Sequence, residues 1–200
     1  MDYVLKDSSR PAILQNKVNF ELMGKNEWRH VSSIDAMHND SLILFLDSTL
    51  IPEKEKLIFI CESIKKPFAI SGSIKVSMKI RINKKDIDLV MDLYEQTPDG
   101  IFFALNENLQ RASYAGDRTK RELLQPEKIE TINMTNTFIT SRQLQKGSRI
   151  IVLLGVNKNP EWQVNYGTGK DVSDETITDA TIPLKIKWYN TSYIQFPILR

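Results

Sequence analysis

The sequence predicts an all-β protein in which two antiparallel sheets pack as a β-sandwich of the jelly-roll kind. Three observations support this prediction. Apolar residues recur at every second position in many short runs, glycine, proline and asparagine separate those runs, and no window keeps an apolar stripe at helical spacing for three turns. With 41% hydrophobic and 26% charged residues among 200, the chain can also fold around one sizeable core.

The first predicted strands lie in the N-terminal third of the chain. Residues 18–22 alternate between core and solvent positions up to Gly24, and residues 28–31 follow as their hairpin partner. Two short apolar runs, 42–46 and 57–61, predict further strands. Between them, the turn residue Pro52 and the charged residues 53–56 favour a connection. We expect residues 1–16 to be an N-terminal lead-in and residues 17–200 to form a single domain.

The strongest alternation in the chain runs from Ile70 to Ile82, which predicts a strand with one buried and one wet face. Residues 87–93 repeat this period, with Asp88 and Asp92 at the polar positions. The turn residues Pro98-Asp99-Gly100 then lead into a partner strand at 101–105. The best helical candidate is a short piece at residues 141–146. Later strands are expected at residues 111–115, 129–134, 149–156, 184–189 and 193–198.

Residues 157–183 form a long polar stretch without strand periodicity, marked by an Asn-Pro pair and by Gly167-Thr168-Gly169. Loops of this length inside a compact domain tend to be functional or to cover an open sheet edge. The glycines and Lys170 look superficially like a phosphate-binding loop, but the full glycine spacing and the hydroxyl residue after lysine are missing. We therefore predict a loop corner and no cofactor.

Composition excludes several classes of partner. The net charge of +2 is too small to predict nucleic-acid or anionic-membrane binding. The longest apolar stretches, 42–46 and 150–154, are far shorter than the roughly 20 residues of a membrane-spanning helix, so no membrane span is expected. The N-terminus does not read as a signal peptide. The single cysteine, Cys61, lies in an apolar run, which predicts a buried free thiol and favours a reducing, cytoplasmic location.

Catalytic machinery is not predicted in this sequence. No Gly-x-Ser-x-Gly elbow is present, and the similar Ser71-Gly72-Ser73 opens an alternating strand, where it indicates a bend. The two histidines, His30 and His38, lie among ordinary strand or turn residues of the N-terminal region. We therefore expect no catalytic residue in the chain.

Two ligand sites remain as alternatives to purely structural roles. Asp171, Asp174, Glu175 and Asp179 could donate oxygens to Ca²⁺, yet their spacing matches no recognised calcium loop, so a solvated acidic loop is the preferred interpretation. Trp162, Tyr166, Trp188 and Tyr189 could stack against a sugar, and the first two lie on the long loop. Aromatic residues of a sandwich more often fill the core, so we expect that Trp162 and Tyr166 are not exposed stacking platforms.

Six clusters of residues, taken together, resemble a known family. They are, in chain order, Val18-x-Phe20-x-Leu22-Met23-Gly24-x-Asn26-x-Trp28-Arg29; Ser71-Gly72; Asp86-x-Asp88-Leu89 with Leu93-Tyr94-Glu95 and Pro98-Asp99-Gly100; Arg111-Ala112-Ser113-Tyr114; Lys146-Gly147-Ser148-Arg149-Ile150; and the loop 157–169 with Asn165 and Thr168-Gly169. In this order they resemble the C-terminal, non-catalytic domain of the X-prolyl dipeptidyl-peptidase and cocaine-esterase (CocE/NonD) hydrolases. One departure is Ser148, where many members have histidine.

The resemblance implies a jelly roll of the galactose-binding-domain-like kind. In complete members the catalytic Ser-Asp-His set belongs to a preceding α/β-hydrolase domain, so this chain should be inactive alone. It should pack on the α/β-hydrolase catalytic domain of the same parent protein and shape substrate access, with Arg111, Tyr114, Trp162 and Tyr166 as ligand or interface candidates. Separated from that domain, it should expose an apolar patch and self-associate. The alternative function is a carbohydrate-binding module of the same fold.

Overall fold

The structure is a computed structural model that describes residues 5–6, 9–46, 56–135, 137–159 and 161–200. The connection predicted at residues 52–56 lies almost entirely outside them. The described strands are β1 (Val18–Leu22), β2 (Glu27–Val31), β3 (Asp40–Phe45), β4 (Lys56–Ile60), β5 (Phe68–Ser73), β6 (Lys75–Ile82), β7 (Asp88–Gln96), β8 (Phe102–Arg111), β9 (Ile129–Met134), β10 (Ile139–Leu144), β11 (Arg149–Val156), β12 (Ile186–Trp188) and β13 (Tyr193–Leu199).

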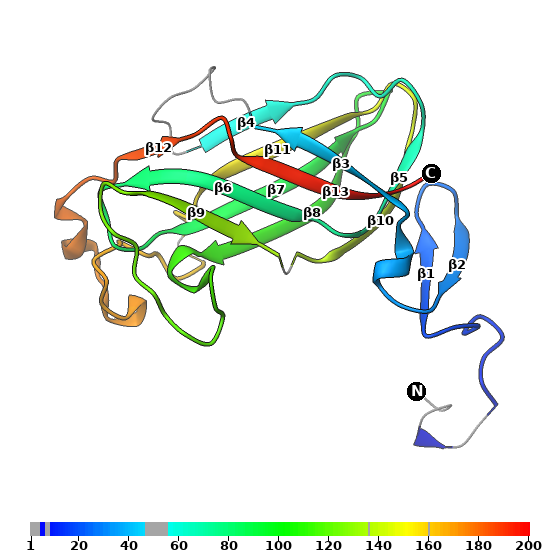
Figure 1. Ribbon diagram of the computed structural model, residues 1–200, viewed down its shortest axis with the longest axis horizontal. Coiled ribbons are helices and arrows are strands. Elements are labelled where there is room, and N and C mark those ends of the chain that lie inside the picture. Colours follow the sequence, from blue (N-terminus) through cyan, green and yellow to red (C-terminus); the bar gives the residue numbers. More distant parts are fainter. Residues whose placement is uncertain (1–4, 7–8, 47–55, 136, 160) are drawn as a thin grey trace.

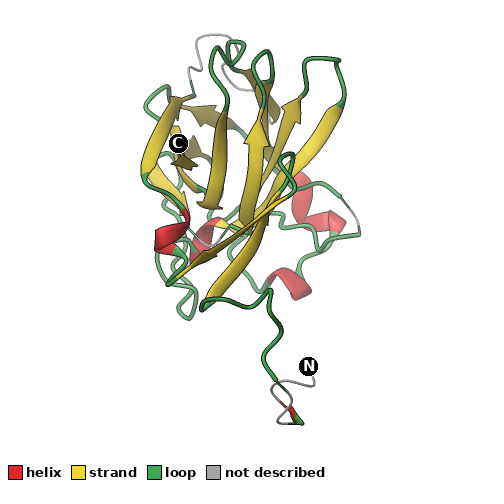
Figure 2. Ribbon diagram, turned by 90° about the vertical axis from the view of Figure 1, so that its right-hand side faces the viewer, coloured by secondary structure: helices red, strands yellow, loops and turns green. Residues whose placement is uncertain are grey.

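Two antiparallel sheets face each other, which confirms the predicted all-β sandwich (Figure 2). The smaller sheet has the strand order β4-β11-β7-β8. The larger sheet has the order β10-β5-β13-β6-β12, with β3 paired to β13 and β9 paired to β6. Between them lies one hydrophobic core, and its fully buried members include Ile70, Met78, Ile80, Leu89, Met91, Leu93, Val152 and Ile194. The jelly-roll connectivity stays a prediction.

Strand alternation places the core residues as the sequence predicts. In β6 every second side chain from Val76 to Ile82 is buried, and in β7 the same holds for Leu89, Met91 and Leu93. The run from Ile70 to Ile82, however, is two strands, β5 and β6. Gly72 has a φ of 132°, a conformation that residues with a side chain rarely adopt, and it lies where the bend was expected. The two strands both pair with β13, and together they act as one long bent strand.

Two predicted elements are wrong. Residues 141–146, the helical candidate, fall mainly in strand β10, which pairs antiparallel with β5 from Ile139 to Leu144. The backbone partners supplied by β5 override the weak local helical pattern. Residues 111–115, predicted as a strand, instead end strand β8 at Arg111 and continue as a short 3-10 helix, Ala112–Tyr114. The side chain of Asp86 accepts a hydrogen bond from the backbone N–H of Ser113 and so favours that turn.

The two ends of the sandwich carry different additions (Figure 1). At one end lies the predicted hairpin β1–β2, which is joined to β10 by hydrogen bonds on either side of Met23. At the other end, residues 157–183 form the long connection that the sequence predicts, with short 3-10 helices at Val172–Asp174 and Ile177–Thr181. In the described part of the chain, no helix has the length and apolar character needed to cross a membrane.

Candidate functional site

Two carboxylates at the start of β7, Asp86 and Asp88, are buried, each with 1% of its surface exposed. Asp86 accepts hydrogen bonds from the Ser113 hydroxyl at 2.6 Å and from the Arg121 guanidinium at 3.2 Å. A buried charge is tolerated only when it is paired and hydrogen-bonded, and Asp86 meets both conditions. Asp86 therefore connects the segment before β7 to the 3-10 helix that follows β8, and it stabilises the conformation of that helix.

Asp88 holds the long loop through a second arginine. The Arg111 guanidinium donates two hydrogen bonds to the Asp88 carboxylate, at 2.9 and 3.0 Å, and this contact raises the pKa of Arg111. The amide of Asn165 donates to the same carboxylate at 2.9 Å, and the backbone N–H of Asn157 donates to the Asp88 carbonyl oxygen at 2.8 Å. The arginine of the predicted interface set is therefore occupied by an internal ion pair that anchors the loop.

The loop itself is organised by the acidic residues that were weighed as calcium ligands. Glu175 accepts hydrogen bonds from the backbone N–H groups of Tyr166 and Thr168, at 2.6 and 2.7 Å. Asp171 accepts hydrogen bonds from the side chain and backbone of Ser173, which lower the pKa of Asp171, and Asp174 is exposed. Among the described residues, no three side chains of the His, Cys, Asp or Glu type gather as they would around a metal ion.

Gly167 shows why the loop corner requires glycine. Its φ is +76°, and a Cβ atom at this position would lie 2.7 Å from the Asp86 carbonyl oxygen. The carbonyl oxygen of Gly167 accepts a hydrogen bond from the backbone N–H of Lys85 at 3.0 Å. The Gly-Thr-Gly-Lys segment is therefore a corner packed against the segment that precedes β7, as the sequence predicts.

A third buried carboxylate, Glu95, lies at the other end of β7 with 0% of its surface exposed. Arg142 of β10 donates to it at 2.8 Å, so this ion pair joins the two sheets inside the sandwich. The Ser148 hydroxyl donates to the second carboxylate oxygen at 2.7 Å. The residue that departs from the family pattern thus has an internal partner of its own.

The described residues do not assemble a nucleophile with its base. His30 shares a hydrogen bond with Asn19, and His38 lies against Gly72 with its Nδ1 atom buried. The buried hydroxyls of Ser113 and Ser148 donate to carboxylates and are not hydrogen-bonded to either histidine. Cys61 is half-buried, where a buried thiol was expected, and burial raises the pKa of its thiol. An unreactive thiol follows from this environment.

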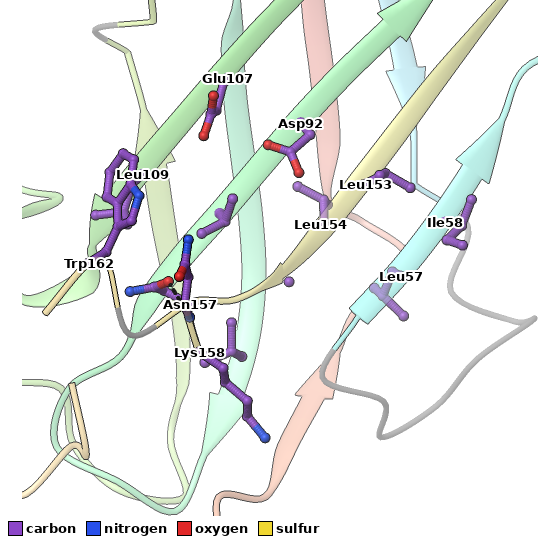
Figure 3. Close-up of a pocket in the computed structure, with 14 residues that line it drawn as sticks. Leu57, Ile58, Asp92, Glu107, Leu109, Leu153, Leu154, Asn157, Lys158 and Trp162 are labelled. Carbon is purple, nitrogen blue, oxygen red and sulfur yellow. Dashed lines mark hydrogen bonds between the residues drawn. The ribbon is translucent and has the colours of Figure 1, made fainter. Parts of the chain in front are cut away.

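A groove of about 500 Å³ lies over the outer face of β4-β11-β7-β8 (Figure 3). Its apolar lining includes Leu109, Leu153 and Ile58. Asp92 and Glu107 lie at one end, on neighbouring strands, and Trp162 closes the side over β8. Volumes of 300–1,000 Å³ are typical of small-ligand sites.

The aromatic candidate residues do not gather at one site. Trp162 is 45% exposed in the groove, so the expectation that it fills the core is wrong, whereas Trp188 is buried. Tyr166 and Tyr114 are half-buried outside the lining of the groove, Tyr166 in the loop and Tyr114 in the 3-10 helix after β8.

The sequence reasoning missed Asp92 and Glu107 as a pair. Asp92 was visible at a polar position of its strand, but Glu107 lies beyond residue 105, where the partner strand was expected to end. The pairing of Asp92 with Glu107 across the two strands could therefore not be predicted from the sequence.

Comparisons with known proteins identify the fold. No family model matches the sequence, and no curated protein is similar to it in sequence. An aminopeptidase from the marine sediment archaeon Thaumarchaeota archaeon matches 100% of this chain with a TM-score of 0.78 and 16% identity, over 42% of its own chain. A CocE/NonD family hydrolase from Staphylococcus aureus matches 100% of this chain with a TM-score of 0.69 and 12% identity, over 44% of its own chain. An α-amino acid ester hydrolase matches 72% of this chain with a TM-score of 0.65 and 18% identity, over 25% of its own chain.

The class that these matches define is an all-β domain with the fold of one part of larger hydrolases. The chain spans less than half the length of each matched hydrolase. The predicted resemblance to a domain of the CocE/NonD hydrolases is thereby confirmed for the fold.

Proposed function

We propose that this chain is a non-catalytic accessory domain of an α/β-hydrolase-type serine peptidase or esterase of the X-prolyl dipeptidyl-peptidase and CocE kind. It packs on the catalytic domain and shapes the access of substrate to the active site. The observation that supports this proposal is the asymmetry of the structural matches. All of this chain superposes on 42% of the archaeal aminopeptidase and on 44% of the staphylococcal hydrolase. An accessory domain is expected to match a longer enzyme in this way.

The internal chemistry of the chain is compatible with a supporting role. Each of the three buried carboxylates of the β7 region is bound to an arginine, so none is left as a general base. These ion pairs stiffen the loop 157–183 and the contact between the sheets. A rigid body of this kind is suited to holding a neighbouring domain in place.

Hydrolysis assays on the isolated chain test the proposal. A small chromogenic ester and an X-Pro anilide should both be left intact, because in the described part of the chain the buried hydroxyls of Ser113 and Ser148 are bound to carboxylates and not to a histidine. Ser113→Ala and Ser148→Ala serve as matched controls, since these two hydroxyls are the buried ones bound to carboxylates. Turnover by the wild type that disappears in either variant would show that the chain is an enzyme in its own right.

Sedimentation at rising concentration tests the packing part of the proposal. A surface that normally faces a catalytic domain buries roughly 600–1,500 Å², and an uncovered patch of that size favours association. The isolated chain should therefore form dimers or larger species. A chain that stays monomeric at every concentration would contradict a role in domain packing.

A carbohydrate-binding module is a second candidate, and one observation favours it. Trp162 is 45% exposed beside the groove, where an indole ring could stack on a sugar. A glycan array should decide between the two functions. Binding by the wild type that is lost in Trp162→Ala and retained in Trp28→Ala, an exposed tryptophan on β2, would favour the carbohydrate module.

A further inference from the structure

The two sheets of the sandwich differ in their outer faces. In the larger sheet, alternate residues of the inner strand β6 are buried in the core, and the residues between them point outward. Opposite two of these, the neighbouring strand β9 contributes Thr131 and Asn133. The outward residues of β6 are all polar: Lys75, Ser77, Lys79 and Arg81. The middle of this face is therefore hydrophilic, as one face of an antiparallel sheet usually is.

The smaller sheet is apolar on its outer side as well as on its core side. In β11 every second residue from Ile150 to Leu154 belongs to the core, so Ile151 and Leu153 point outward. The register pairs these two with Ile60 and Ile58 of β4, whose side chains are 58% and 59% exposed. Both strands are accordingly almost continuous apolar runs, a pattern typical of strands that are covered on both faces.

The same outer surface continues across β7 and β8. One outward pair of these strands is charged, and each of the other pairs contains an apolar or aromatic residue. The opposed pairs are Val90 with Leu109, Asp92 with Glu107, Tyr94 with Ala104, and Gln96 with Phe102. At the border of the sheet, the side chain of Phe102 is 58% exposed. The outer side of β4-β11-β7-β8 is thus a largely apolar face, which we call the β11 face.

The β11 face has the size of a contact between domains. Its four strands lie about 4.8 Å apart, and about 20 Å of strand length gives the face an area of roughly 400 Å². Covering it would bury roughly 800 Å² on both partners together, which lies within the range of contacts between domains of one chain. Hollows of about 500 and 370 Å³ lie on the same face, so it can receive protruding side chains of a partner (Figure 3).

We propose that the β11 face is the surface on which the catalytic domain packs, through an apolar surface of its own. This inference rests on the proposed accessory function and adds the place of contact. The occupant follows from the matched hydrolases, because each continues for more than half of its length beyond the part that this chain matches. That remaining part would cover the apolar face, and the hydrophilic face of the larger sheet would stay in water.

Sedimentation of the full chain and of three single variants tests the place of contact. Ile58→Lys on β4 and Phe102→Lys on β8 put a charge at opposite borders of the β11 face, at side chains that are already more than half exposed. Each should weaken the self-association of the isolated chain about tenfold or more, because the lysine must be removed from water. Phe45→Lys is the matched control and should leave association unchanged, since Phe45 is 63% exposed on the outer face of the larger sheet.

Each result of this experiment has a separate meaning. Association that persists in both β11-face variants, or that Phe45→Lys abolishes, would overturn the inference and leave the accessory function standing. Loss in only one of Ile58→Lys and Phe102→Lys would place the contact at one edge of the sheet and would also overturn it. A closed dimer with a dissociation constant below about 1 µM would assign the face to a second copy of this chain. A wild type that stays monomeric would contradict the accessory function itself.

Hydroxyl-radical footprinting of the wild type locates the contact without any variant. Tyr94 on the β11 face and Tyr193 on the outer face of the larger sheet are both half-buried, so they form a matched pair. Oxidation of Tyr94 should fall in proportion to the fraction of associated chains, whereas oxidation of Tyr193 should stay constant. Protection of Tyr193 in place of Tyr94 would overturn the inference.

Discussion

Strand β7 carries acidic residues in two contrasting environments. Asp88 and Glu95, near its two ends, are at most 1% exposed, and each is bound by an arginine. Asp92, between them, lies on the outer face and is opposed by another carboxylate, that of Glu107. The contrast shows how burial sets the requirement for pairing. Removing a carboxylate from water costs several kcal/mol unless an opposite charge and hydrogen bonds replace the water, whereas a partly exposed pair of like charges costs about 1 kcal/mol or less.

The buried pairs also have a topological consequence. Arg142 lies 47 residues after Glu95 and belongs to the other sheet, so this ion pair joins segments that only the folded chain brings together. Arg111 lies opposite Asp88 in the β7–β8 hairpin, and the distant segment that this pair gains is the long loop, through Asn165. The outer pair, Asp92 and Glu107, also lies within the β7–β8 hairpin, on the face that points away from the core. The buried pairs therefore support the architecture, whereas the outer pair lines a groove on the open face of the sheet.

The largest expected effect is at the pair that joins the sheets. Arg142→Met leaves the Glu95 carboxylate buried without its cation, and it should lower the free energy of unfolding by about 3–5 kcal/mol. Urea denaturation measures this loss. Lys146→Met, an exposed lysine two residues after β10, should change stability little. A loss of stability below about 1 kcal/mol for Arg142→Met would contradict the comparison, because a buried carboxylate would then not require an opposite charge.

Arg111→Lys tests the geometry of the pair that holds the loop. Lysine keeps the positive charge but cannot donate two parallel hydrogen bonds to Asp88, so stability should fall by about 1.5–3 kcal/mol. Proteolysis within residues 157–183 should become faster, because Asn165 then shares a less ordered carboxylate. Unchanged proteolysis would indicate that the ion pair does not anchor the loop.

Gly167→Ala tests the close packing of the loop on Asp86. The added methyl group would lie 2.7 Å from the Asp86 carbonyl oxygen, at a φ of +76°. Gly100→Ala is the matched control, since its φ is +88° and no atom lies within 4 Å of the added group. We expect Gly167→Ala to cost about 1–3 kcal/mol more than Gly100→Ala, because only Gly167 adds a steric clash to the backbone strain. Equal costs in thermal melting would show that the loop moves away without penalty.

The smallest expected effect has the opposite sign. Glu107→Gln removes the repulsion with Asp92 and should raise the free energy of unfolding by about 0.2–1 kcal/mol. Chemical denaturation in low salt is the sensitive measurement, since salt screens exposed charges. Glu95→Gln should destabilise the chain in the same assay. If Glu107→Gln lowered stability as Glu95→Gln does, the Glu107 carboxylate would stabilise the fold, and the contrast between the outer and the buried carboxylates would fail.

The sequence predicted the sandwich well where one strand face is buried and the other is wet. The alternation in β6 and β7 could be read directly, because period-two burial is a local property of an extended chain. Residues 141–146 could not be assigned in this way, since polar residues such as Ser141 and Gln143 give β10 little alternation of its own. Its strand conformation comes from pairing with β5. The groove was predicted only in part. Trp162 was a candidate from the sequence, whereas the residues that line the groove with it were not.

The sequence by itself determined the fold class, the long loop and the acidic positions of β7, because each depends on neighbouring residues and their spacing. Tertiary structure alone decided which of those acids would be buried in an ion pair and which would line an open groove. Asp88 and Asp92 lie four residues apart at equivalent polar positions of one strand, and no local pattern separates them. The difference arises because Arg111 and the loop 157–183 cover Asp88, whereas β8 brings Glu107 beside Asp92 on an open face. Contacts between segments far apart in sequence set the charge environment, and those contacts exist only in the folded chain.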